Sequence, residues 1–175
     1  MRLGDDFFRR DAREVAPELA GKLLACKTAQ GVSALRIAET EIYLGEADTA
    51  CHAHKGRTSR TDALYRSGGT IYVYLCYGMH WLINIVTAEE ENPQCVLIRA
   101  CERPFDGPGK LTRRLGIDKR FYGESICTHP DIWIEDDGAR YALDALPRVG
   151  IGYASEEDQA RPWRYVIREK LQSEE

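Results

Sequence analysis

The sequence predicts a single α+β domain in which a curved, mainly antiparallel β-sheet is flanked by a long N-terminal helix and several short helices. Its 175 residues, 43% of them hydrophobic, suffice for one sizeable core and are too few to favour two. One early segment has apolar residues at helical spacing, whereas later segments are short and rich in β-branched and aromatic residues. We find no repeat or linker, so residues 1–175 are expected to form one domain.

The N-terminal elements are a helix followed by two strands. The helix is expected over Ala12–Leu24, where Asp11 can serve as N-cap and apolar residues recur at helical spacing. The strands are expected over Leu23–Thr28 and Val32–Glu41, joined at Gln30-Gly31, a turn signal. These segments predict a helix that packs on a hairpin.

The central and C-terminal elements are mostly strands. Gly45–Gly69 is polar and rich in Gly, Ser, Thr and Arg, which is typical of a functional loop. Gly107-Pro108-Gly109 breaks the chain before a short helix at Lys110–Leu115. The strands are expected at Ile71–Cys76, Trp81–Thr87, Gln94–Cys101, Asp131–Glu135, Arg148–Tyr153 and Arg164–Arg168.

Composition limits the location and the partners. The six cysteines form no C-x-x-C pair, and the start shows no secretory signal, so we expect free thiols and a cytoplasmic protein, associated with the nucleoid if prokaryotic. The longest apolar run, Leu75–Val86, is interrupted, which argues against a membrane partner. A net charge of −4 disfavours bulk attraction to nucleic acid, but basic residues cluster within 55–66 and 110–120 and can form a basic face.

An acidic pair stands out on the second predicted strand. Glu39 and Glu41 lie two residues apart, so their side chains share one face about 6.6 Å apart, with Tyr43 beside them. This spacing suits hydrolysis through a water, although a solvated strand face is the simpler interpretation. Arg99 lies in an apolar strand and would be costly to bury alone, so we expect it to pair with Glu41.

Aromatic and imidazole side chains follow in a second group. Tyr72 and Tyr74 share a strand face, either as ordinary packing or as ring faces for a planar or cationic ligand. Tyr77 precedes Gly78 at a turn, where a side chain could wedge into DNA. Cys51-His52-Ala53-His54 lacks a second cluster with ligand spacing, so we expect no metal and a neutral His52 that hydrogen-bonds a substrate. Asn84 is either a core amide or a selector in a pocket.

These residues, in this order, resemble the alkyladenine DNA glycosylase family, the 3-methyladenine DNA glycosylases of the methylpurine type. The resemblance covers nearly the whole chain, from Arg2 to Arg164. The matching motifs are Arg36-Ile37-Ala38-Glu39-Thr40-Glu41-Ile42-Tyr43-Leu44-Gly45, His52, Lys55-Gly56-Arg57-Thr58, Tyr72-Val73-Tyr74, Tyr77-Gly78-Met79, Asn84, Val96-Leu97-Ile98-Arg99-Ala100, Gly107-Pro108-Gly109-Lys110-Leu111 and Arg148-Val149-Gly150-Ile151-Gly152.

The resemblance implies roles at matching positions. Glu41 would be the general base that activates water, which Arg99 and the Val149 carbonyl would help to hold. Tyr77 would intercalate into the minor groove in place of an extruded nucleotide. Asn84 would disfavour normal purines that carry an extra amino group. The base would be sandwiched by Tyr43, His52 and Tyr74, and the DNA surface would include Arg57, Met79, Leu97 and Lys110.

The implied function is a DNA repair glycosylase that flips alkylated purines from duplex DNA and hydrolyses the N-glycosidic bond. 3-Methyladenine and 7-methylguanine are the expected substrates, with hypoxanthine as a further candidate. No lysine occupies the Glu41 position, so simple hydrolysis without strand cleavage is expected, by a monomer without cofactor. Two alternatives remain: a non-catalytic damaged-DNA-binding protein of the same fold, and a small-molecule hydrolase using Glu39 and Glu41.

Overall fold

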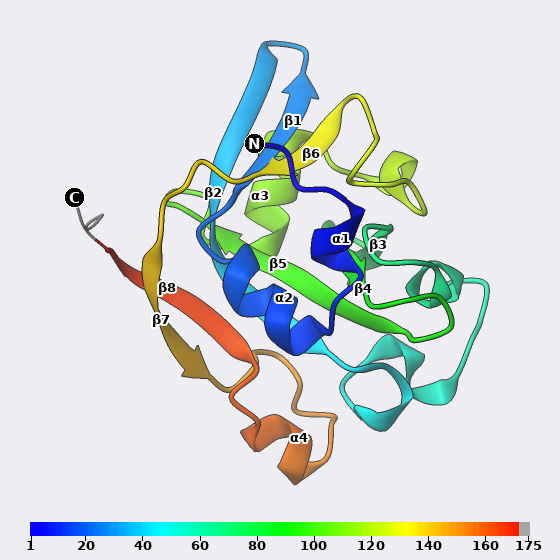
Figure 1. Ribbon diagram of the computed structural model, residues 1–175. Helices are drawn as coiled ribbons and strands as arrows, with labels where there is room; N and C mark the ends of the chain where they lie inside the picture. Colours follow the sequence, from blue (N-terminus) through cyan, green and yellow to red (C-terminus); the bar gives the residue numbers. More distant parts are fainter. Residues whose placement is uncertain (172–175) are drawn as a thin grey trace.

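The computed structural model describes residues 1–171 and confirms the α+β class with a curled antiparallel sheet (Figure 1). The α-helices are α1 (Asp5–Phe8), α2 (Ala12–Leu19), α3 (Pro108–Leu115) and α4 (Glu156–Ala160). Short 3₁₀ helices are η1 (Gly45–Ala47), η2 (His52–Lys55), η3 (Asp62–Tyr65) and η4 (Lys119–Phe121). The strands are β1 (Leu23–Thr28), β2 (Gly31–Tyr43), β3 (Ile71–Cys76), β4 (His80–Thr87), β5 (Gln94–Cys101), β6 (Ile132–Glu135), β7 (Tyr141–Leu146) and β8 (Arg164–Lys170).

Strand β2 organises the sheet, whose order is β3-β4-β5-β2-β1-β6 with β8 pairing both β2 and β7. The first half of β2 pairs with β1, whereas its second half pairs with β5 and β8. The register with β5 shifts between Ile37 and Thr40, which is the signature of a β-bulge. A bulge bends and twists a strand, so the long β2 can serve both halves of the curled sheet.

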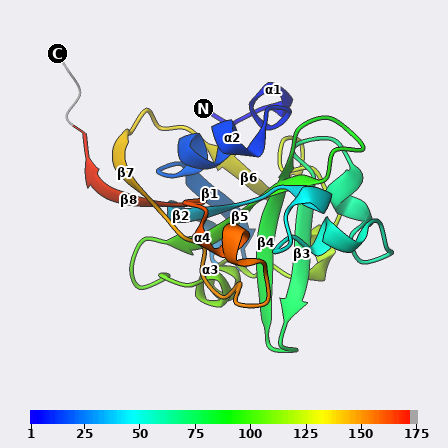
Figure 2. The ribbon, with the colours of Figure 1, turned by 90° about the horizontal axis from the view of Figure 1, so that it is seen from below.

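Helices cover both sides of the sheet. Figure 2 shows α1 and α2 on one side of β2 and β5 and α3 on the other. Helix α2 buries Val15 and Leu19, and the Thr40 hydroxyl of β2 donates to the Ala16 carbonyl at 2.9 Å. Helix α3 buries Leu111 and Leu115. Within residues 1–171, none of the helices has the length and apolar character needed to cross a bilayer.

The long N-terminal helix predicted over Ala12–Leu24 is wrong in length. Helix α2 ends at Leu19 because Ala20 is extended and Gly21 adopts a φ of +90°, a conformation that favours glycine. A Cβ at Gly21 would also lie 2.6 Å from the Tyr141 ring, so the chain can turn here only without a side chain. The apolar residues Leu23 and Leu24, which extend the helical spacing in the sequence, belong to strand β1 instead.

The later strands were predicted with mixed success. The meander β3–β4–β5 is confirmed within one residue at each end, and β6 and β8 lie where strands were expected. The strand expected at Arg148–Tyr153 is wrong, because this segment is a loop tied to the body by the buried Arg148 side chain. Strand β7 and helix α4 on either side of that loop were not predicted.

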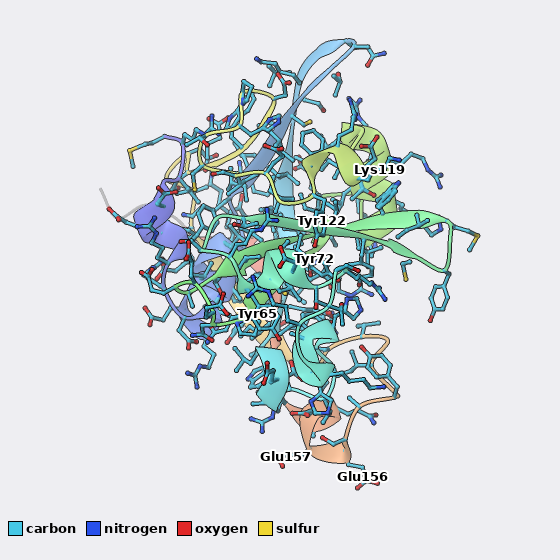
Figure 3. All side chains as sticks on the ribbon, turned by 90° about the vertical axis from the view of Figure 1, so that its right-hand side faces the viewer. Tyr65, Tyr72, Lys119, Tyr122, Glu156 and Glu157 are labelled. Carbon is cyan, nitrogen blue, oxygen red and sulfur yellow. The ribbon has the colours of Figure 1, made fainter. Side chains whose placement is uncertain are left out.

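The β3–β4 hairpin projects from the body of the molecule (Figures 2 and 3). At its turn the Met79 N–H donates to the Cys76 carbonyl at 3.0 Å, and Tyr77 and Gly78 have φ values of +49° and +67°. These are features of a type I′ turn, which matches the twist of a hairpin. Tyr77 is 89% exposed and Met79 69%, which confirms the predicted exposed turn. A tyrosine at positive φ is unusual, and strain of this kind gathers at functional sites.

Candidate active site

Alternation along β2 places Glu41 and Tyr43 on the face opposite α2. Thr40 contacts α2, and Ile42 belongs to the core, as the period of two requires. Glu41 is 1% exposed, and its carboxylate accepts hydrogen bonds from the Tyr43 hydroxyl at 2.7 Å and the Val149 N–H at 2.9 Å. The Arg99 Nε lies 3.3 Å from Glu41 Oε1. The predicted Arg99–Glu41 pair is therefore present.

Opposing effects set the pKa of Glu41. Burial raises it above its usual range, while the Val149 N–H, the Tyr43 hydroxyl and Arg99 lower it by stabilising the charged form. Burial prevails over these three effects, so the pKa of Glu41 is raised. A buried carboxylate that accepts hydrogen bonds and has a raised pKa is suited to take a proton from water.

Glu39 is placed differently from Glu41. It is held by Arg164 at 3.0 Å, and Arg99 approaches it at 4.0 Å. The β-bulge separates the two acids, and the groove described below is lined by Glu41 and not by Glu39 within residues 1–171. An ion pair with an arginine keeps a carboxylate ionised, so Glu39 is poorly placed to donate a proton as a catalytic acid. This geometry does not favour the small-molecule hydrolase.

Two adjoining hollows lie beside Glu41. The outer one is a groove of about 570 Å³, a size typical of small-molecule sites. The inner one is a narrow cleft of about 30 Å³, enough for about one water. They share six residues, which are Tyr43, Ala50, Cys51, His52, Tyr74 and Tyr153. Aromatic walls thus run from the open groove to the interior.

His52 contacts both Tyr72 and Tyr74. Its Nδ1 lies 2.9 Å from the Tyr72 hydroxyl, and its ring meets Tyr74 edge-on with centroids 4.5 Å apart. Burial, helped by the charge of Arg60, lowers the pKa of His52 to about 4. His52 is therefore uncharged at neutral pH, as the sequence predicts.

Tyr72 and Asn84 line the inner cleft next to His52 and Tyr74. Tyr72 is fully buried and stacks edge-on with Tyr122, with centroids 6.1 Å apart, and Figure 3 shows these two rings together. The Asn84 amide donates to the Tyr72 carbonyl at 3.2 Å, and the Cys95 thiol approaches its oxygen. Asn84 is thus held by protein atoms at the floor of the cleft, while a selective role stays a prediction.

The metal alternative at Cys51–His54 is not favoured by the contacts. The Nδ1 of His54 lies 2.8 Å from the Glu46 carbonyl, and burial raises the pKa of the Cys51 thiol to about 11. Across residues 1–171, no three or more His, Cys, Asp or Glu side chains are grouped as metal ligands would be. The side chains of His52 and His54 therefore serve other contacts.

The groove brings together most of the predicted site residues, but not all of them. Those that line it are Glu41, Tyr43, His52, Tyr74, Tyr77, Leu97, Arg99 and Val149. Leu97, expected at the DNA surface, is only 5% exposed. Arg57 is paired with Asp62 and Glu91, and Lys110 with Asp106, outside the groove.

Sequence reasoning missed a buried ion pair behind Tyr43. Arg148 Nη1 lies 2.6 Å from Asp48 Oδ2, both side chains are fully buried, and the guanidinium packs 4.8 Å from the Tyr43 ring centre. Since Arg148 adjoins Val149, this pair positions the N–H that contacts Glu41. An arginine next to a Gly-rich loop and a distant aspartate gave no sequence signal that they would meet.

Comparison with known proteins agrees with this geometry. A family profile described as Methylpurine-DNA glycosylase (MPG) matches residues 6–106 and 102–171. The chain belongs to this family. Relatives that carry the name "Putative 3-methyladenine DNA glycosylase" include one from Psychrobacter cryohalolentis, 40% identical with 91% of this chain and 89% of the relative covered. Another, from Borrelia garinii, is 41% identical with 93% and 94% covered.

Membership of the methylpurine-DNA glycosylase family confirms the predicted resemblance and makes this chain a DNA glycosylase, an enzyme of DNA repair. The predicted alternatives of a non-catalytic reader and a small-molecule hydrolase are not supported.

Proposed function

We propose that this glycosylase flips alkylated purines out of duplex DNA and hydrolyses their N-glycosidic bond, leaving an abasic site. The substrates would be 3-methyladenine and 7-methylguanine, with hypoxanthine as a further one. The observation that carries the proposal is Glu41, buried at the wall of an aromatic groove and hydrogen-bonded as a carboxylate. The name that these relatives carry supports 3-methyladenine as a substrate.

The chemistry follows from the charge of the base. A 3- or 7-alkylated purine is cationic, so the faces of Tyr43 and Tyr74 attract it more than a neutral base. When the bond from C1′ to the base nitrogen breaks, its electron pair neutralises the leaving base. A water oxygen bonds to C1′, and Glu41 takes the water proton. Val149 and Arg99 hold Glu41 in place, and the Val149 carbonyl would help to hold the water.

Duplex DNA would be engaged by the projecting β3–β4 hairpin. Tyr77 at its tip would fill the gap left by the extruded nucleotide, as wedge side chains do in minor grooves. Flipping costs a few kcal/mol and is cheapest for damaged bases, which adds selectivity before the pocket acts. Arg57, Met79 and Lys110 would support the DNA, and the buried Leu97 would form part of the groove wall, with one protein molecule per lesion in the cytoplasm or nucleoid.

The test is release of bases from methylated duplex DNA by the wild-type protein under single-turnover conditions. Chromatography of the supernatant identifies the bases, and a denaturing gel before and after alkali treatment separates abasic sites from direct strand cleavage. We expect free 3-methyladenine and 7-methylguanine, with breaks only after alkali. Release of neither base would refute the proposal.

A further inference from the structure

Arg60 holds a position at the mouth of the groove that the proposed mechanism does not use. Its guanidinium carbon lies 5.5 Å from the centre of the Tyr74 ring, the wall expected to stack on the base. Its backbone carbonyl accepts a hydrogen bond from the Tyr122 hydroxyl at 3.0 Å. The backbone is thus anchored while the charged end lies over Tyr74.

The charge of Arg60 is not balanced by a neighbouring acid. Three charged side chains line the groove, and two of them, Glu41 and Arg99, pair with each other. None of the ion pairs formed within residues 1–171 includes Arg60, in contrast to the nearby Arg57 and Arg66. The groove therefore carries one excess positive charge at its aromatic wall.

The charge of Arg60 acts on His52 inside the site. After burial, Arg60 is the second cause of the lowered pKa of His52, so its charge disfavours a second cation there. A cationic alkylpurine stacked on Tyr74 would meet the same repulsion, and it would compete with Arg60 for the ring. An uncharged purine lesion would meet neither effect.

We propose that Arg60 is a specificity-determining residue that lowers excision of cationic alkylpurines relative to uncharged purine lesions. The inference rests on the proposed function and adds to it the residue that sets the balance between two substrate classes. The guanidinium is exposed, and in water a unit charge roughly 5–9 Å from a cation changes its rate by about two- to threefold. Added salt reduces this factor by screening.

The test compares duplexes that carry either 7-methylguanine or hypoxanthine, each with saturating enzyme in single turnovers. Arg60→Gln is expected to raise 7-methylguanine release about two- to threefold, with hypoxanthine release at or below its wild-type rate. Arg60→Lys keeps the charge and should keep the wild-type balance. Arg13→Gln removes one charge from α2, across the sheet from the groove, and controls for general attraction to DNA.

The outcomes separate this inference from the proposed function. If the wild type releases neither base, the proposed function fails and the selectivity role fails with it. If the wild type is active and Arg60→Gln changes both rates equally, or lowers 7-methylguanine release, the selectivity role alone is overturned. Equal loss with both lesions would mean that Arg60 contacts the DNA backbone.

Discussion

Replacing Arg148 by methionine should destabilise the protein strongly. The side chain is fully buried and donates to Asp48 at 2.6 and 2.9 Å, to the Ile42 carbonyl at 2.8 Å and to the Asp158 carbonyl at 3.3 Å. Its removal leaves the Asp48 carboxylate buried without its counter-ion, which costs about 3–5 kcal/mol. A domain of this size typically has about 5–15 kcal/mol of stability, so the variant should still fold.

Urea unfolding of the wild type and variants measures this effect. Arg161→Met is the matched control, because Arg148 and Arg161 both pack on Trp163, at 5.0 and 4.7 Å from its ring centre, and both pair with acids. Arg161 is 36% exposed, so about 1 kcal/mol is expected. Arg148→Met with Asp48→Asn should cost less than the two single changes added together, since the pair is lost only once. If Arg148→Met costs no more than Arg161→Met, the reasoning is refuted.

Two further predictions concern catalysis. Arg99→Gln removes a positive charge that lowers the pKa of Glu41, so the base is protonated at higher pH. The acid limb of the single-turnover rate should therefore move to higher pH, and an unmoved limb would contradict the role of Arg99. Tyr77→Ala should weaken binding of lesion DNA by about tenfold while the preference among lesions stays unchanged, measured by competition binding and base release. A changed preference with unchanged binding would place Tyr77 in the pocket instead.

The sequence predicts the sheet better than its connections. Strands β3, β4 and β5 show local alternation and turn residues, and those signals are sufficient to define their ends. The end of α2 depends instead on Gly21 beside Tyr141, a contact between residues far apart in sequence. The loop that contains Arg148 resembles a strand in composition but is held by a buried ion pair that no local pattern encodes.

The same division applies to the site. Glu41 and Tyr43 could be predicted to share a face because strand period alone decides it. Their mutual hydrogen bond, the Val149 N–H on Glu41 and the pairing of Glu39 with Arg164 depend on how β8 and the preceding loop return to β2. Arg60 over Tyr74 likewise needs the three-dimensional path of the chain between η2 and η3.

The measurement that tests the central claim most directly is base release by Glu41→Gln beside the wild type. The substitution preserves size but removes the carboxylate that would accept the proton, while binding of duplexes carrying 7-methylguanine is followed in parallel. We predict that release falls by at least about 100-fold, as expected for loss of a general base, with binding largely intact. Release at the wild-type rate by Glu41→Gln would contradict the account.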